Sequence, residues 1–535
     1  MRRYVKIAAT GFIVGALFLG AAWAGGGLIP IDLSGGQEQA GDVQSGELEE
    51  RLATAAESLP GEATEGEGAT FELQPGQVLA GASKVSMEPR PVAYEGVWET
   101  EGCATMDEDA PPDASHVADF RVRWPEKPNC LYMGGYGIGP MNPITKWTDP
   151  YGLWIRSLAI GDGSDTLVLT IVDGVYYFGD YANMCDGCGF FDLAAELGAE
   201  LQIDPDGFIF ASTHSHTSPD FIGGWGGVPD WYFRQVADAI RQSVTEAVDS
   251  MRPGVIEMGE AFARPFNSER RDFYHSAEDN ALSWFRVIDA TQAASPQPVA
   301  IATVGGYSAH PVTADESTGI ADADFPGVFN ARVEERFGGT GLFFQAGFGN
   351  VSPRGNKVEL GGGLANLIPE PGLGTVIENP DVRSAQAFWD QPVTNSGLTA
   401  LGVPGFFDRP FAQKPSSVST GENANKPCTS ASAVTVTTAV SAAKIGPLVI
   451  TGAPGEIFSN YSNTIEEKNP NGITMALSLV NDGLGYIMQS FETDHAGRQV
   501  LGFVGEVVEY EDAYSIDHCF GDMALETTLT LLGGL

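Results

Sequence analysis

The sequence predicts an α/β fold in which layered mixed β-sheets are flanked by helices. Two observations lead to this prediction. Continuous apolar runs recur along the chain from about residue 150 onward and indicate buried strands. An amphipathic segment, with apolar residues at three- and four-residue steps, indicates a helix between them. Helices interleaved with continuous apolar strands are typical of layered α/β domains.

Each element is justified by its own pattern. The apolar runs predict buried strands at residues 153–160, 166–175, 207–213, 282–289, 298–307, 341–347 and 447–454. A helix is predicted over 230–251, where Phe233, Val236 and Ile240 begin a series that continues at helical spacing. The last segment, 523–535, is also expected to be helical.

The N-terminal region has the composition of a targeting segment followed by a linker. A basic start and the apolar run 7–24 indicate a signal peptide over 1–24, or a signal anchor, because the run is long enough to span a bilayer. Residues 25–76 are rich in Gly and Glu and are expected to be disordered. The globular domain is expected over 77–535, with an inserted loop at about 90–130.

Composition limits the compartment and the partners. The chain has 535 residues, 43% of them apolar, and can bury a large core. Its net charge of −41 argues against binding to nucleic acid or to anionic lipid, so membrane contact is expected only through the N-terminal segment. Six cysteines in an exported chain allow up to three disulfides, and Cys103 is expected to pair with Cys130. Cys185 and Cys188 have no second C-x-x-C pair with which to bind zinc.

Two of the seven histidines stand together in ASTHSHTSP, directly after the apolar run at 207–211. Residues two apart on a strand project to the same face, so His214 and His216 would form half of a metal site. The alternative is that they are loop histidines bonded to the backbone.

Four further residues follow apolar runs: His310 in GGYSAHPVTAD, Ser352 in QAGFGNVSPR, Glu456 in GAPGEIFSNYSN and Tyr486 in NDGLGYIMQS. Each has an ordinary interpretation, as a turn residue or, for Glu456, as a helix cap. Together they share one position, the end of a strand, which is where open α/β sheets place their sites.

This set of motifs resembles the neutral/alkaline non-lysosomal ceramidase family. THSHTSP is similar to the family's THTHSGP, SAHPVTA to VH-x-TS, GNVSPR to G-D/N-V-S-P-N, and TGAPGEIF to GAP-x-E-F/I. The motifs also occur in the same order, and the resemblance extends from about residue 77 to the end. It implies a ceramidase-like catalytic domain.

The resemblance also implies roles for individual residues. One zinc ion would be held by His214, His310, Glu456 and Tyr486. The catalytic residues would be Ser352 as nucleophile, His216 as acid/base and Arg270, or its neighbour Arg271, as partner of the substrate oxygen. Amide hydrolysis needs a nucleophile, a group that holds the oxyanion and a proton for the leaving amine. The nucleophile is either a zinc-activated water or the serine.

The chain also departs from the family. DFIGG follows THSHTSP in place of a glycine pair, Thr148 stands where the family often has a histidine, and Thr313-Ala314 replaces Thr-Ser. No immunoglobulin-like C-terminal domain is expected. The sequence therefore predicts an exported zinc-dependent amide hydrolase that acts on an N-acyl lipid or another N-acylated small molecule. The alternatives are an esterase or lactonase on the same scaffold, and a non-catalytic envelope binding protein.

Overall fold

The computed structural model describes residues 73–103, 105, 129–135, 140–148, 151–181, 184–271, 277–292, 295, 298–405, 407–421, 427–493 and 510–535. The predicted signal segment, nearly all of the predicted linker and the central part of the predicted inserted loop lie outside these residues. The first strand begins at Gln77.

A mixed nine-stranded sheet forms the centre of the fold, with the order β11-β9-β8-β6-β1-β3-β4-β5 and β13 beside β6. Its strands are β1 (Gln77–Ser86), β3 (Trp154–Gly161), β4 (Thr166–Val172), β5 (Phe208–Ser212), β6 (Arg252–Phe262), β8 (Ala281–Asp289), β9 (Ala300–Tyr307), β11 (Thr340–Gln345) and β13 (Thr375–Val376). The pairs β4–β5 and β9–β11 are parallel and the other pairs are antiparallel. The mixed sheet agrees with the predicted fold class.

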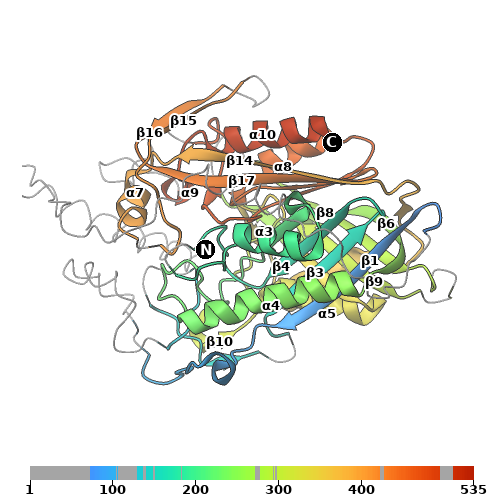
Figure 1. Ribbon diagram of the computed structural model, residues 1–535, viewed down its shortest axis with the longest axis horizontal. Coiled ribbons are helices and arrows are strands. Elements are labelled where there is room, and N and C mark those ends of the chain that lie inside the picture. Colours follow the sequence, from blue (N-terminus) through green and yellow to red (C-terminus); the bar gives the residue numbers. More distant parts are fainter. Residues whose placement is uncertain are drawn as a thin grey trace, which may run out of the picture.

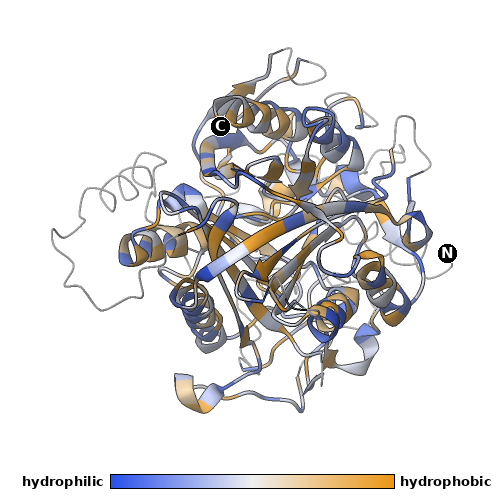
Figure 2. Cartoon of the chain, turned by 90° about the vertical axis from the view of Figure 1, so that its right-hand side faces the viewer, coloured by the Kyte–Doolittle hydropathy of each residue, from blue (hydrophilic) through white to orange (hydrophobic). Residues whose placement is uncertain are grey.

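Helices cover one face of this sheet. They are α3 (Phe190–Leu201), α4 (Asp230–Asp249), α5 (Asp324–Phe337) and α6 (Lys357–Leu367). On α4 the predicted apolar series, including Phe233, Val236 and Ile240, is buried against the strands. The helices around the strands carry both hydrophobic and hydrophilic residues, as Figure 2 shows, and this is the amphipathic pattern that a covering helix needs.

A second, four-stranded sheet packs on the opposite face. Its order is β14-β17-β18-β20, formed by β14 (Val382–Pro392), β17 (Thr435–Ile445), β18 (Leu448–Gly452) and β20 (Ile473–Leu477). Phe285 of the large sheet and Ile450 and Leu477 of the small sheet belong to one buried cluster between the two. The outer face is covered by α8 (Ser459–Glu466) and α10 (Phe520–Gly534), which lie beside β14 and β17 at the top of Figure 1. The layers are therefore helix, sheet, sheet, helix.

Short elements complete the chain and carry much of the candidate site. The short strands are β2 (Lys146–Trp147), β7 (Asn267–Glu269), β10 (Ile320–Ala321), β12 (Val351–Pro353), β15 (Ser416–Ser419), β16 (Thr429–Ser432), β19 (Glu456–Ile457) and β21 (Tyr486–Ile487). The short helices are α7 (Ser396–Gly402), α9 (Tyr510–Ala513) and the 3₁₀ turns η1 (Pro91–Tyr94), η3 (Pro205–Gly207), η4 (Arg264–Phe266) and η5 (Glu316–Thr318). β12 pairs with β7, and β19 pairs with β21.

The large sheet curls until its two edge strands meet. β11 contacts β5 as well as β9, and the Gln345 side chain at the end of β11 donates to the Thr213 carbonyl just after β5, at 3.0 Å. Strand twist accumulates across a wide sheet and makes this approach possible. The ends of strands that lie far apart in the sheet order are thereby brought together.

The predicted strands and helices are present, with ends that differ by a few residues. The strand predicted over 166–175 stops at Val172 because the chain turns there, and the Gly174 amide donates to the Val172 carbonyl at 2.8 Å. The helix predicted over 523–535 begins earlier, at Phe520. The prediction contained no counterpart of α3, α5, α6, β6, β14 or β17.

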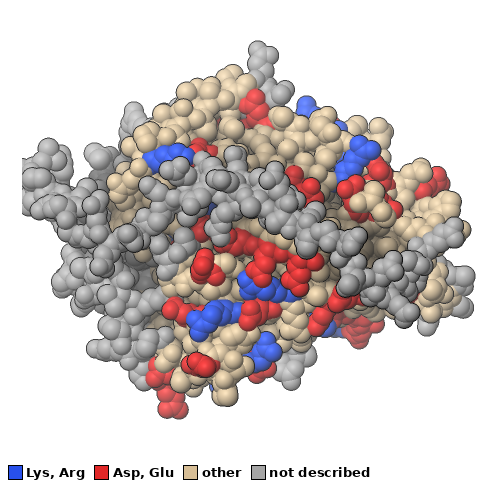
Figure 3. Space-filling model, in the orientation of Figure 1, with Lys and Arg blue, Asp and Glu red and all other residues tan. Residues whose placement is uncertain are grey.

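The disulfides, the lengths of the helices and the charged surface can each be compared with what the sequence predicted. Cys103 is bonded to Cys130, as predicted, and the other pairs are Cys185–Cys188 and Cys428–Cys519. Across the described ranges, no helix has the length and apolarity needed to cross a bilayer. Figure 3 shows acidic side chains spread over one face of the molecule with basic ones among them. One of the ion pairs joins Arg241 of α4 to Glu196 of α3 at 2.7 Å.

Candidate metal centre and active site

His214 stands in a strained turn just beyond β5. The strand ends at Ser212, and the amide of His214 donates to the Gly174 carbonyl at 2.8 Å. His214 has a φ of 63°, in the left-handed region that a residue other than glycine seldom adopts. The alternation of a strand predicted that the two histidines share one face. They do not, because both lie beyond the end of β5. Instead, the turn brings Nε2 of His216 to 3.1 Å from Nε2 of His214.

Backbone carbonyls orient both predicted histidine ligands. Nδ1 of His214 lies 2.8 Å from the carbonyl oxygen of Val175, and Nδ1 of His310, which follows β9, lies 3.0 Å from that of Val351. Because a carbonyl can only accept a hydrogen bond, each Nδ1 carries the proton. In a neutral ring the lone pair is then on Nε2, which is the arrangement commonly found for histidines that bind a metal.

Glu456 presents its carboxylate to these two nitrogens. Its side chain is 2% exposed and comes from β19. Oε2 lies 3.0 Å from Nε2 of His310, and Oε1 lies 3.7 Å from Nε2 of His214. The three residues offer ligand atoms that all lie within 4.8 Å of one another.

The protonation states follow from burial and charge. Burial lowers the pKa of His214 to about 4 and also lowers the pKa of His310. Burial alone would raise the pKa of Glu456, but the positive charge that His214 and His310 carry in acid holds it at about 2. At neutral pH both imidazoles are therefore uncharged and the carboxylate is ionised.

The donor set fits a zinc ion. Two imidazole lone pairs and a carboxylate face one small space, and neither Nε2 carries a proton that could lie between them. Such acceptors repel one another unless a cation joins them. Two histidines and a glutamate are a donor set typical of zinc.

Another cluster of potential ligands, at Cys428, His518 and Cys519, has its two sulfurs joined in a disulfide.

His216 lies directly beside this cluster. Besides the contact of its Nε2 with His214, its backbone amide donates to the Pro311 carbonyl at 3.2 Å. Burial lowers its pKa well below the ordinary value. The backbone at Gly135, with φ +97°, passes so close to the ring that a Cβ there would overlap it. Glycine is therefore required at this position for the ring to fit.

Arg270 and Tyr486 lie together on another side of the cluster. Tyr486 is opposite Glu456 in the β19–β21 pairing, and its hydroxyl accepts from Nη2 of Arg270 at 2.9 Å. Nη1 of the same guanidinium lies 3.4 Å from the ring nitrogens of His310, and Nε donates to Glu511 at 2.8 Å. Of the two arginines that the sequence left open, Arg270 therefore reaches the cluster, whereas Arg271 contacts Asp512 and Glu511.

Ser352 lies on β12, next to the residue that orients His310. It is opposite Ser268 of β7, and the carbonyl of its neighbour Val351 contacts His310 Nδ1. Its side chain is partly buried. Among the described residues that line the pocket at the cluster, Ser352 does not appear. The structure thus places Ser352 near the predicted metal ligands but outside the pocket wall.

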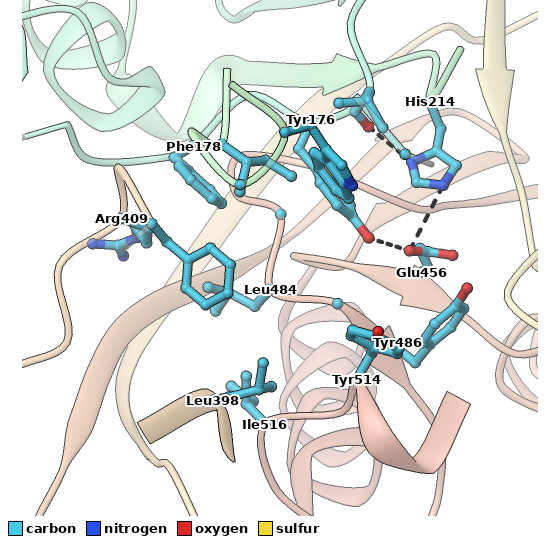
Figure 4. Close-up of a pocket in the computed structure, with 18 of the residues that line it drawn as sticks. Tyr176, Phe178, His214, Leu398, Arg409, Glu456, Leu484, Tyr486, Tyr514 and Ile516 are labelled. Carbon is cyan, nitrogen blue, oxygen red and sulfur yellow. Dashed lines mark hydrogen bonds and ion pairs between the residues drawn. The ribbon is translucent and has the colours of Figure 1, made fainter. Parts of the chain in front are cut away.

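A pocket leads to the cluster, and His214, His216, Glu456 and Tyr486 form its polar end. Figure 4 shows His214, Glu456 and Tyr486 at this end. The rest of the wall is largely apolar and consists of Phe178, Ile222, Trp225, Leu398, Leu401, Phe407, Phe411, Leu484 and Ile516. Arg409 is the charged residue in this wall, and its Nη2 donates to Asp482 at 2.9 Å. Much of the wall comes from α7 and the segment after it, for which the sequence offered no motif.

One wall of the pocket is a loop organised by Asp220. Oδ1 of this buried carboxylate accepts from the amides of Ile222 at 2.9 Å and Gly223 at 3.1 Å. Oδ2 accepts from Trp225 at 2.7 Å and Gly227 at 2.9 Å. Burial raises the pKa of Asp220, and these amides lower it. The DFIGG stretch, where the chain departs from the ceramidase motif, is therefore part of a loop that the Asp220 carboxylate holds in place and that forms one wall of the pocket.

Comparison with known proteins places the fold. No family model matches the chain, and no curated protein matches it. Among solved structures, the neutral ceramidase from Pseudomonas aeruginosa is similar over 86% of this chain and 73% of its own, with 16% identity and a TM-score of 0.55. A ceramidase complexed with C2 is similar over 85% of this chain and 74% of its own, with 15% identity and a TM-score of 0.55. At this identity the likeness shows the fold, and it confirms the predicted ceramidase-like α/β architecture.

Proposed function

We propose that the protein is a zinc-dependent hydrolase of linear amide bonds that acts on an N-acyl lipid or a related N-acylated small molecule. One observation carries the proposal: the lone pairs of two neutral histidines and the charge of a buried glutamate converge at the polar end of an apolar pocket. The fold shared with neutral ceramidases supports the same chemistry.

The ion would be held by His214, His310 and Glu456, with Tyr486 as the fourth ligand that the sequence motifs imply. Bound there, zinc polarises an amide carbonyl and lowers the pKa of water, which is the chemistry that amide hydrolysis needs. The carbonyls of Val175 and Val351 support the assignment because they fix which nitrogen of each ring is available.

The surrounding residues supply the other parts of the reaction. Arg270 is a fixed cation that reaches both His310 and Tyr486, so it is placed to hold the substrate oxygen as negative charge develops on it. His216 presents Nε2 to the same space, where it can take a proton from the attacking nucleophile and pass it to the departing amine nitrogen. Ser352 is the alternative to water as nucleophile, and it lies next to Val351, whose carbonyl orients His310.

The apolar wall supports a hydrocarbon chain as part of the substrate. Leu398, Phe407 and Ile516 are side chains of the kind that bury acyl chains. The Arg409 charge in the same wall is paired with Asp482 and Asp180, at 2.9 and 3.3 Å, so the wall offers no free positive charge to an anionic substrate. An N-acyl group in the pocket would bring its amide to the metal-ligand end.

Export is part of the proposal. The N-terminal pattern of a signal segment and the three disulfides both support a protein that works outside the reducing cytosol.

A substrate panel tests the proposed reaction. The purified, zinc-loaded protein is assayed against N-acyl amides of increasing chain length and against esters with the same acyl groups. We expect turnover of amides that improves with chain length. Turnover of esters without any amide would favour an esterase, and no turnover of either by the zinc-loaded protein would favour a binding protein. His214→Ala serves as the inactive control.

A further inference from the structure

Tyr176 lies between the apolar pocket and the metal-ligand cluster, at a position that no sequence motif marked. It follows β4 in the segment GVYYFG, and its side chain is 8% exposed. The ring lines the pocket and lies with its centroid 5.0 Å from that of His214. Its hydroxyl donates to Oε1 of Glu456, as the dashed line in Figure 4 shows.

The hydrogen bond from Tyr176 is important because of which other side chains can donate to the Glu456 carboxylate. A buried carboxylate requires donors. The other side-chain contact of Glu456 at hydrogen-bond distance is Nε2 of His310, which carries a lone pair because Nδ1 donates to Val351. In the part of the chain that the structure describes, Tyr176 is therefore the residue whose side chain must donate to Glu456.

The same short segment holds two of the predicted ligands. The carbonyl of Val175 orients His214, and the hydroxyl of the next residue, Tyr176, contacts Glu456. The ring of Tyr176 is itself held, because it packs so closely on Gly483 that a Cβ there would overlap it. Residues 175 and 176 thus connect His214 and Glu456 through one rigid stretch of backbone.

We propose that Tyr176 is a positioning residue of the metal centre, whose hydroxyl holds Oε1 of Glu456 so that the carboxylate faces both histidines. The inference rests on the proposed zinc site. A glutamate side chain has several rotamers, and fixing one of them before the metal binds removes an entropy cost from binding. Loss of the hydroxyl leaves the carboxylate free to turn away and leaves one oxygen without its donor.

The next residue, Tyr177, provides a matched control. Its side chain is 1% exposed, and its hydroxyl donates to the Cys188 carbonyl at 2.8 Å, away from the cluster. Tyr177→Phe therefore removes one buried hydroxyl and one hydrogen bond, as Tyr176→Phe does, without touching a predicted ligand.

The experiment compares the zinc affinity of the full-length parent, Tyr176→Phe, Tyr177→Phe and His214→Ala by competition with a chelator. The absorption spectra of the cobalt-loaded proteins and the melting temperatures of the metal-free proteins are measured in the same experiment. We expect Tyr176→Phe to raise the Kd for zinc about 10–100-fold, the usual effect of losing a group that holds a ligand, and to change the cobalt spectrum. Tyr177→Phe should leave both unchanged.

Two results would overturn the role of Tyr176 without affecting the proposed zinc site. One is an unchanged Kd for zinc in Tyr176→Phe while His214→Ala loses zinc. The other is an equal loss of zinc affinity in Tyr176→Phe and Tyr177→Phe, which would indicate a general packing effect. Full zinc retention by His214→Ala would instead overturn the metal site itself and the inference with it.

Discussion

Replacing Asp220 with asparagine should open the loop that forms one wall of the pocket. The substitution keeps the size of the side chain but exchanges one carboxylate oxygen for an NH₂ group. If Oδ2 is the oxygen replaced, the amides of Trp225 and Gly227, at 2.7 and 2.9 Å, lose their acceptor and face another donor. Replacement of Oδ1 would affect the amides of Ile222 and Gly223 in the same way.

The structure sets the size of the effect. A hydrogen bond to a charged group contributes about 1.5–3 kcal/mol, so two of them amount to about 3–6 kcal/mol of local stability. Since about 1.4 kcal/mol corresponds to a factor of ten, amide exchange in the loop should accelerate at least roughly a hundredfold. The pocket wall at Trp225 would become mobile, so KM for a long-chain substrate should rise more than kcat falls.

Hydrogen exchange followed by mass spectrometry, on the peptide that contains the loop, provides the assay. Asp238→Asn is the control, because Asp238 is an exposed residue of α4 paired with Arg241 at 3.1 Å, and such pairs contribute about 0–1 kcal/mol. Exchange in Asp220→Asn that matches both the parent and this control would refute the reasoning, because it would mean that the carboxylate does not hold the loop.

Three further predictions concern the nucleophile, the core and the pH dependence of stability. Ser352→Ala should keep zinc and lose most amide hydrolysis if serine attacks; unchanged kcat/KM, measured beside zinc content, would assign the attack to water. Glu257→Gln should lower the free energy of unfolding by about 3–5 kcal/mol in urea denaturation, because it leaves the fully buried Arg286 uncompensated, and a loss under about 1 kcal/mol would contradict this. Burial raises the pKa of Glu492 to about 7, so the folded state holds a proton that the unfolded state has released, and stability should fall as pH rises from about 4.5 through 7. Urea denaturation across this range should show a smaller fall in Glu492→Gln, and an identical fall would contradict the assignment.

The parts of the fold that the sequence predicted are those where whole strands are apolar. β4 has large aliphatic residues along most of its length, and β11 has Leu342, Phe343 and Phe344 in a row, because both faces of these strands are covered. β17 was not predicted because its buried positions are filled mostly by Thr, Ala and Ser, small residues that let two sheets approach without forming an apolar run. Helix α6 was missed because three consecutive glycines interrupt its pattern.

The candidate site also contains residues that the sequence predicted and residues that it did not. His214, His310 and Glu456 were expected from short motifs, and the structure brings them together from elements far apart in the chain. Tyr176 could not be found in this way because its role comes from one hydroxyl reaching Glu456, 280 residues later in the chain. Leu398 and the rest of the apolar wall have no pattern of their own, since their function depends only on which surface the fold turns toward the cluster.

Zinc content tests the central claim most directly. The parent protein, His214→Ala, Glu456→Ala and the control His518→Ala, which changes a histidine outside the cluster, are purified without chelator and analysed for metal by elemental analysis. We predict about one zinc per chain in the parent and in His518→Ala, and little in the other two. Full zinc in both His214→Ala and Glu456→Ala, or no zinc in the parent even after reconstitution, would contradict the account.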